Sequence, residues 1–141
     1  MGTMLRTTIG DLFDEVASRF PDREALIDLP RGRRYSYQEL LIIVNRLARG
    51  FLKLGIRKGE HLALWTPNLS ESIITEFAAA KIGAVLMTLD TNAQPQQLGY
   101  LLRQSDSQTL IMSEGTNGTE HIEMIRQLCP EVDTSAPGQL D

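Results

Sequence analysis

One cysteine, Cys129, is present among the 141 residues of the sequence. A single thiol excludes a disulfide within the chain and a metal site made of cysteines. The sequence also lacks a run of about 18 apolar residues, so it predicts no transmembrane helix. Its first residues include no apolar stretch of the kind that a secretory signal needs. Together these absences predict a cytoplasmic protein in a reducing compartment.

Recognisable catalytic and phosphate-binding motifs are also missing. Neither glycine-rich phosphate motif occurs, and the nearest substitute, Ser113–Gly118, carries an acidic Glu114 and no lysine. The histidines His61 and His121 lack both zinc spacing and a partner nucleophile, so we expect surface or half-buried side chains. Cys129 has no local base and is expected to pack as a small apolar residue. We therefore assign no catalytic, cofactor-binding or metal-binding residue to this chain.

The balance of charge disfavours polyanionic partners. A net charge of -4 argues against nucleic acid or an anionic membrane as the main partner. A small basic cluster, Arg31, Arg33 and Arg34, falls at an expected turn between two short strands. We interpret this cluster as a solvated hairpin tip.

Polar residues follow two apolar stretches that we expect to be parallel strands. Thr66, Asn68 and Ser70 follow the first stretch, and Asp90-Thr91-Asn92 follows the second. Ligands of open α/β sheets bind beyond the carboxyl ends of the strands, so these residues are the best candidates for lining a cleft. Structural roles are the stronger expectation, with Asn68 and Ser70 capping a helix and Asp90 closing a turn.

Strand and helix patterns alternate along the chain. Strands are expected at 24–29, 34–36, 61–66, 84–89 and 109–112, and the run 84–89 is apolar enough to be covered on both faces. Helices are expected at about 9–20, between Ser36 and Gly55, from Ser70 to Gly83, from Pro95 through Leu102, and at about 120–128. Thr8 should cap the first helix, whose apolar stripe is Ile9, Leu12, Phe13, Val16 and Phe20. Ser36 and Glu39 have the spacing of a capping box.

This alternation predicts an α/β fold with a mainly parallel sheet and covering helices. We expect residues 8–130 to form one α/β subdomain. Residues 1–7 should be a disordered or cloning-derived N-terminus, and residues 131–141 a flexible tail.

Three stretches of the chain carry a family resemblance. They are Tyr35-Ser36-Tyr37-Gln38-Glu39-Leu40, then Ala79-Ala80-Lys81-Ile82-Gly83-Ala84-Val85-Leu86-Met87-Thr88-Leu89-Asp90, and finally Leu101-Leu102-Arg103-Gln104-Ser105-Asp106 with Leu128-Cys129-Pro130-Glu131. In this order they resemble the start of an AMP-forming acyl-CoA synthetase, within the adenylate-forming enzyme superfamily. The last stretch is most similar to the medium-chain fatty-acyl branch.

The resemblance implies the amino-terminal part of an ATP-dependent fatty-acid–CoA ligase. Such enzymes use ATP and Mg²⁺ to convert a carboxylic acid into an acyl-adenylate, and CoA then takes the acyl group as a thioester. The family's phosphate loop and catalytic lysine have no counterpart here, so the resemblance implies a truncated piece that is inactive alone and binds none of these cofactors tightly. Its partners would be the remainder of the same polypeptide and, through exposed apolar surface, a second copy.

Two other functions stay open at the level of the residues. The chain could be a free-standing α/β module that binds a small ligand or nucleotide near Thr66 and Asp90. It could also be a fragment of an adenylation domain that loads a carrier protein.

Overall fold

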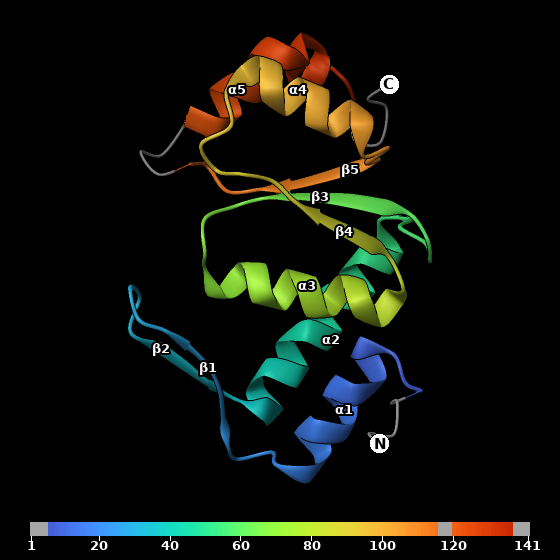
Figure 1. Ribbon diagram of the computed structural model, residues 1–141, viewed down its shortest axis with the longest axis vertical. Helices are drawn as coiled ribbons and strands as arrows, with labels where there is room; N and C mark the ends of the chain where they lie inside the picture. Colours follow the sequence, from blue (N-terminus) through green and yellow to red (C-terminus); the bar gives the residue numbers. More distant parts are fainter. Residues whose placement is uncertain (1–5, 116–119, 137–141) are drawn as a thin grey trace, which may run out of the picture. The chain divides into compact units, whose positions relative to one another are not determined.

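The structure is a computed structural model that describes residues 6–115 and 120–136. The chain divides into two compact units, which are described separately (Figure 1). Unit 1 consists of residues 1–60 and 68–86, and unit 2 of residues 61–67 and 87–141. The elements of unit 1 are α1 (Ile9–Arg19), β1 (Glu24–Asp28), β2 (Arg33–Ser36), α2 (Tyr37–Lys53) and α3 (Ser70–Ile82). Those of unit 2 are β3 (His61–Trp65), β4 (Val85–Thr88, shared with unit 1), α4 (Pro95–Gln104), β5 (Thr109–Met112), α5 (Glu120–Leu128) and the 3₁₀ helix η1 (Pro130–Asp133).

Helix α1 begins as predicted, but its buried face differs in part from the predicted one. Thr8 Oγ1 accepts a hydrogen bond from the backbone N–H of Asp11 at 3.1 Å, which confirms the N-cap. The apolar stripe predicted for this helix is correct only in part, because Phe13 is 4% exposed whereas Ile9 remains 67% exposed. The buried positions are Gly10, Phe13 and Ala17.

Close packing on α3 explains the rotation of α1. A Cβ atom built on Gly10 would lie 3.0 Å from the Cα atom of Lys81, so the two backbones approach where α1 has no side chain. Next to this crossing, the rings of Phe13 and Phe77 stack with centroids 4.4 Å apart. Small residues therefore set the buried face, and a hydrophobic pattern alone does not reveal it.

Helix α2 has the ends that its sequence predicts. Ser36 Oγ accepts from the N–H of Glu39 at 3.2 Å, and Glu39 Oε2 accepts from the N–H of Ser36 at 2.8 Å. Both bonds of the capping box are thus present. Beyond the last turn, Gly55 has a φ of 94°, the left-handed conformation that terminates many helices.

The sheet of unit 2 has the strand order β4–β3–β5. Strands β3 and β5 are parallel, in a register that runs from Leu62 opposite Thr109 to Trp65 opposite Met112. The central strand β3 is buried over four of its five residues. The prediction of a strand covered on both faces is wrong for 84–89, because Val85 (47% exposed) and Thr88, on opposite faces of β4, are both exposed. The parallel α/β architecture itself is confirmed.

Helices α4 and α5 lie together on one face of this sheet (Figure 1). The apolar core of unit 2 consists of Ala63, Trp65, Leu89, Ala93 and Leu98. Pro95 opens α4 at its first turn, as predicted. The tail that was expected to be flexible begins with the 3₁₀ helix η1, and its residues 137–141 lie outside the described part. Over residues 6–115 and 120–136, every helix is too short or too polar to cross a bilayer.

Candidate functional site

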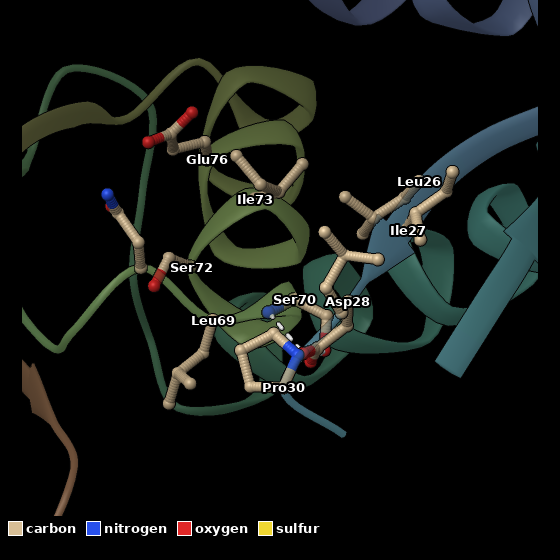
Figure 2. Close-up of a pocket in the computed structure, with 11 residues that line it drawn as sticks. Leu26, Ile27, Asp28, Pro30, Leu69, Ser70, Ser72, Ile73 and Glu76 are labelled. Atoms are coloured by element: carbon tan, nitrogen blue, oxygen red, sulfur yellow. Dashed lines mark hydrogen bonds between the residues drawn. The ribbon is translucent and has the colours of Figure 1, made fainter. Parts of the chain in front are cut away.

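The N-terminus of α3 is held by a carboxylate that comes from β1 (Figure 2). Asp28 Oδ2 accepts a hydrogen bond from Ser70 Oγ at 2.8 Å and lies 3.4 Å from the backbone N–H of the same residue. Leu69 occupies the N-cap position and forms no side-chain bond there. Because Asp28 is only 5% exposed, a nearly buried negative charge lies at the positive end of the helix dipole.

This arrangement corrects the predicted capping role of Ser70 and Asn68. Ser70 is the first helical residue, and its hydroxyl donates to Asp28 instead of accepting from the helix backbone. Asn68 is exposed in the preceding bend. Sequence reasoning missed Asp28 because the cap comes from 42 positions earlier, and no local pattern encodes a contact at that separation. The only local signal was a carboxylate at the end of a strand.

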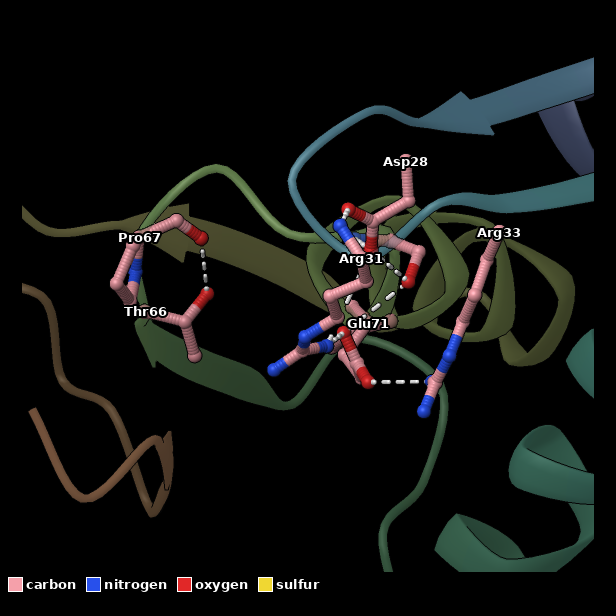
Figure 3. A network of polar contacts seen from close by, with 8 residues as sticks. Asp28, Arg31, Arg33, Thr66, Pro67 and Glu71 are labelled. Atoms are coloured by element: carbon pink, nitrogen blue, oxygen red, sulfur yellow. Dashed lines mark hydrogen bonds and ion pairs between the residues drawn. The ribbon is translucent and has the colours of Figure 1, made fainter. Parts of the chain in front are cut away.

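A second layer of charges surrounds this cap (Figure 3). The backbone N–H of Arg31 donates to Asp28 Oδ1 at 3.3 Å, and the Arg31 guanidinium pairs with Glu71. Arg33 lies 3.6 Å from the other oxygen of Glu71. Arg34 pairs with Glu24 across the hairpin at 2.6 Å. The arginines predicted to form a solvated tip are therefore paired with carboxylates of unit 1.

These contacts keep both carboxylates ionised. The hydrogen bond from Ser70 is the largest cause that holds the pKa of Asp28 below its ordinary value, against desolvation, with further help from the N–H and charge of Arg31. For Glu71, desolvation is the largest single influence and raises the pKa. Hydrogen bonds from its own backbone, Arg31 and Ser70 together outweigh this influence, so the pKa of Glu71 is also lowered. The cluster is thus a network of fixed opposite charges.

A cavity of about 290 Å³ adjoins the capped helix end. Its walls are partly apolar, from Ile27, Leu29 and Ile73, and it also contains the acidic Asp28 and Glu76 (Figure 2). A free helix N-terminus attracts phosphate, but here the carboxylate of Asp28 already occupies that position. A second anion would meet two negative charges, so the geometry disfavours a phosphate-binding role for this cavity.

The other strand-end residues lie in unit 2. Thr66 Oγ1 donates to the carbonyl of Pro67 at 3.1 Å (Figure 3). The carbonyl of Asp90 accepts from Trp65 Nε1 at 3.0 Å, and its carboxylate accepts from the N–H of Asn92 at 2.9 Å. Thr91 belongs to the same turn. The turn-closing role predicted for Asp90 is therefore confirmed.

The two histidines have different environments. His61 is half-buried, as expected, and its Nδ1 lies 2.6 Å from the carbonyl of Ser105. The same expectation is wrong for His121, which is 1% exposed and stacks on Trp65 with ring centroids 3.7 Å apart. Its Nδ1 also lies 3.2 Å from the carbonyl of Ser113. A packed aromatic pair at the start of α5 explains this burial. The last residues of the candidate loop 113–118 lie outside the described part.

Cys129 lines a second cavity, of about 570 Å³, in unit 2. Desolvation, followed by the charge of Glu131, raises the pKa of its thiol, which disfavours the reactive thiolate. Leu110, Ile125 and Leu128 supply much of the apolar wall, and Arg103 the only cationic side chain among the lining residues. Over residues 6–115 and 120–136, no three His, Cys, Asp or Glu side chains gather in a way that could hold a metal ion.

Comparison with protein families gives one clear match. The sequence profile of the family described as "AMP-binding enzyme" matches residues 13–139. The chain is 41% identical over 140 residues to "Putative acyl-CoA synthetase YngI" of Bacillus subtilis (strain 168), covering 99% of this chain and 26% of the relative. It is 32% identical to "Medium-chain acyl-CoA ligase ACSF2, mitochondrial" of Mus musculus, covering 97% of this chain and 22% of the relative. The chain thus spans about a quarter of the length of these relatives.

Solved structures show the same similarity. The N-terminal domain of FACL13 from Mycobacterium tuberculosis superimposes with a TM-score of 0.79 at 28% identity, covering 95% of this chain and 32% of that chain. The NpsA N-terminal subdomain of Klebsiella oxytoca, solved with anthranilyl-AMSN, gives a TM-score of 0.72 at 32% identity, covering 76% of this chain and 27% of that chain.

Proposed function

The chain belongs to the AMP-binding enzyme family, and we propose that it is the amino-terminal part of an ATP-dependent fatty-acid–CoA ligase. One observation carries the proposal: 99% of the chain aligns, at 41% identity, with a relative described as an acyl-CoA synthetase. The similarity to medium-chain acyl-CoA ligases, at 32% identity over 97% of the chain, supports a fatty acid as the substrate.

The proposed enzyme joins a carboxylic acid to CoA in two steps. ATP and Mg²⁺ convert the acid into an acyl-adenylate with release of pyrophosphate, and CoA then displaces AMP to form a thioester. The residues described here do not fit a metal ion, because they offer no cluster of three suitable ligands. The N-terminus of α3 is likewise filled by Asp28. In this proposal the chain therefore takes no part in the chemical steps and supports the rest of the enzyme structurally.

The proposal extends to the organisation of the chain. Residues 8–130 would be the α/β subdomain, preceded by residues 1–7 and followed by the tail 131–141. Its main partner would be the remainder of the same polypeptide, in the cytoplasm. Two large apolar side chains of unit 1 are exposed, Leu29 at 79% and Ile27 at 42%, and they would support contact with that remainder or with a second copy.

A second candidate function is a fragment of an adenylation domain that loads a carrier protein. The observation that favours it is the likeness to NpsA, which also occurs in a structure described as an artificially fused adenylation–PCP di-domain. The two candidates share adenylation and differ in the thiol that accepts the acyl group. The third reading, a free-standing ligand-binding module, gains no support from these relatives.

Fatty-acid-dependent AMP formation by the native gene product tests the proposal. The whole native reading frame that includes these residues should be expressed beside residues 1–141 alone. We expect the longer protein to form AMP and acyl-CoA from ATP, a medium-chain fatty acid and CoA, and the 141-residue chain to form neither. Replacing CoA by a phosphopantetheinyl carrier protein distinguishes the second candidate. Acyl-CoA formation by the 141-residue chain alone, or none by the longer protein, would contradict the proposal.

A further inference from the structure

The segment from Leu40 to Gly59 contains basic side chains and no acidic one. It includes most of α2 and the turn that follows, and Glu39 and Glu60 border it. Its five cations are Arg46, Arg49, Lys53, Arg57 and Lys58. Clusters of about four to eight Lys and Arg residues are typical of proteins that bind anionic lipid headgroups.

Three of these cations share one face of α2. Arg46, Arg49 and Lys53 follow the spacing i, i+3, i+7, which places them on consecutive turns of the same side. All three are exposed, whereas the buried residues of α2 are Leu40, Val44, Ala48 and Phe51 on the opposite side. We call Arg46, Arg49 and Lys53 the basic face of α2.

The basic face of α2 is not neutralised from within the described chain. Other exposed arginines pair with carboxylates, such as Arg33 with Glu71 and Arg34 with Glu24. Over residues 6–115 and 120–136, by contrast, no ion pair involves a side chain of the basic face. Lys53 lies in the last turn, where its positive charge interacts favourably with the helix dipole. The dipole acts only within that turn, so it does not explain why a cation stands at Arg46.

The net negative charge of the whole chain is unevenly distributed between the two units. Twelve of the fourteen Lys and Arg residues fall in unit 1, against ten of the eighteen Asp and Glu residues. Unit 1 therefore carries a net charge of +2 and unit 2 a net charge of -6, which together give the total of -4. The negative total charge therefore does not exclude an anionic membrane as a partner of unit 1, because screening limits electrostatic effects to about 10 Å at 0.1 M salt.

Exposed aliphatic side chains accompany the cations. Ile42 lies one turn before Arg46 on the same face and is 62% exposed. Leu52 and Leu54, beside Lys53, are 56% and 78% exposed. We propose that the basic face of α2, with Ile42, Leu52 and Leu54, binds the surface of an anionic phospholipid bilayer. This proposal does not depend on the proposed enzymatic function.

The aliphatic side chains favour a bilayer over a nucleic acid. Nucleic acids reward cations and stacking aromatic rings, and the outer side of α2 presents Ile42 and Leu52 instead. A bilayer interface gains from both components, because cations contact lipid phosphates while aliphatic groups enter the acyl boundary. The binding should be weak and reversible, since the apolar stripe of α2 is packed inside unit 1.

Vesicle co-sedimentation of the 141-residue chain tests this proposal. The probe is a phosphatidylcholine vesicle that contains phosphatidylglycerol, beside a vesicle of phosphatidylcholine alone. We expect binding to the anionic vesicle only, and release at about 1 M salt, where the Debye length is about 3 Å. Each neutralised cation should weaken binding about fivefold, so the triple variant Arg46→Gln, Arg49→Gln, Lys53→Gln should lose about 100-fold.

A matched triple variant separates the basic face of α2 from net charge. Arg19→Gln, Arg34→Gln and Arg126→Gln remove three exposed cations that pair with carboxylates elsewhere, and they should reduce binding much less. Leu52→Ser with Leu54→Ser should weaken binding to the anionic vesicle at low salt. Thermal melts of all variants should match the parent, since every changed side chain is exposed. Equal losses in the two triple variants would overturn the proposal. So would binding to heparin as tight as binding to the anionic vesicle, together with leucine variants that bind as the parent does.

Discussion

The carboxylate of Asp28 accepts the hydroxyl hydrogen of Ser70 at 2.8 Å, although the two residues are 42 positions apart. This bond joins the end of β1 to the start of α3. Because Leu69 supplies no side-chain cap, Asp28 carries both the polar cap and the negative charge that a helix N-terminus favours. The contact thus fixes the hairpin to α3 through one nearly buried side chain.

Removal of the Asp28 carboxylate should loosen unit 1. In Asp28→Ala, Ser70 Oγ and the backbone N–H groups of Ser70 and Arg31 lose their acceptor. We expect the melting temperature to fall by about 4 °C, the effect of a lost cap in a chain of this size. Asp28→Asn keeps an acceptor but loses the charge, so its melting temperature should lie between those of the parent and Asp28→Ala.

Asp22 offers the control for these changes. It is an exposed aspartate of the same unit, and Asp22→Ala and Asp22→Asn should leave the thermal melt unchanged. A melt of Asp28→Ala that coincides with that of Asp22→Ala would show that the cap contributes nothing. Circular dichroism at 222 nm suits the comparison, since α3 is one of the long helices of the chain.

Acidification should abolish the advantage of Asp28 over asparagine. The pKa of Asp28 in the folded chain lies below its ordinary value of 3.8, so folding favours the ionised form. The resulting stabilisation is complete above about pH 5 and is lost as the pH falls through 3.8 and then through the folded pKa. The gap in melting temperature between the parent and Asp28→Asn should therefore be constant near neutral pH and close in acid. A gap that widened as the pH fell would reverse the assigned direction of the pKa shift.

Local signals predicted much of this fold. Ser36 and Glu39 are three residues apart, so the capping box that starts α2 could be predicted, and β5 and α5 have the predicted bounds. Contacts between distant segments could not be predicted from local patterns. The cap of α3 comes from Asp28, the face of α1 depends on Gly10 meeting Lys81, and His121 is buried because it stacks on Trp65. Each of these depends on a partner at least 42 positions away.

Two helical glycines should respond oppositely to alanine. In α2, a Cβ atom on Gly50 would have no neighbour within 4 Å, so Gly50→Ala should add about 0.5–1 kcal/mol to the free energy of unfolding through backbone entropy. In α1, the Cβ atom of Gly10→Ala would press on the Cα atom of Lys81 at 3.0 Å. That clash with backbone should outweigh the same gain and cost about 1–3 kcal/mol in total.

Urea unfolding of the two glycine variants measures these changes directly. The midpoint should rise for Gly50→Ala and fall for Gly10→Ala, with the slope against urea unchanged in both. A Gly10→Ala variant as stable as Gly50→Ala would mean that α1 and α3 do not pack as closely as the structure places them.

The ring of His121 should matter through its packing more than through its polarity. It is buried and stacks on Trp65, and its Nδ1 lies 3.2 Å from the carbonyl of Ser113. His121→Ala would leave a cavity beside Trp65 and should cost about 3 kcal/mol. His121→Phe retains an aromatic ring and loses only the contact with Ser113, so it should cost about 1 kcal/mol.

Trp65 is the only tryptophan of the chain, so its fluorescence reports both unfolding and the loss of the stacked ring. The control is Gln127→Ala, which changes an exposed side chain in the same helix as His121, whereas His61 is half-buried and therefore unsuitable. If His121→Phe were as unstable as His121→Ala, the bond to Ser113 would be the dominant interaction and the packing argument would be wrong.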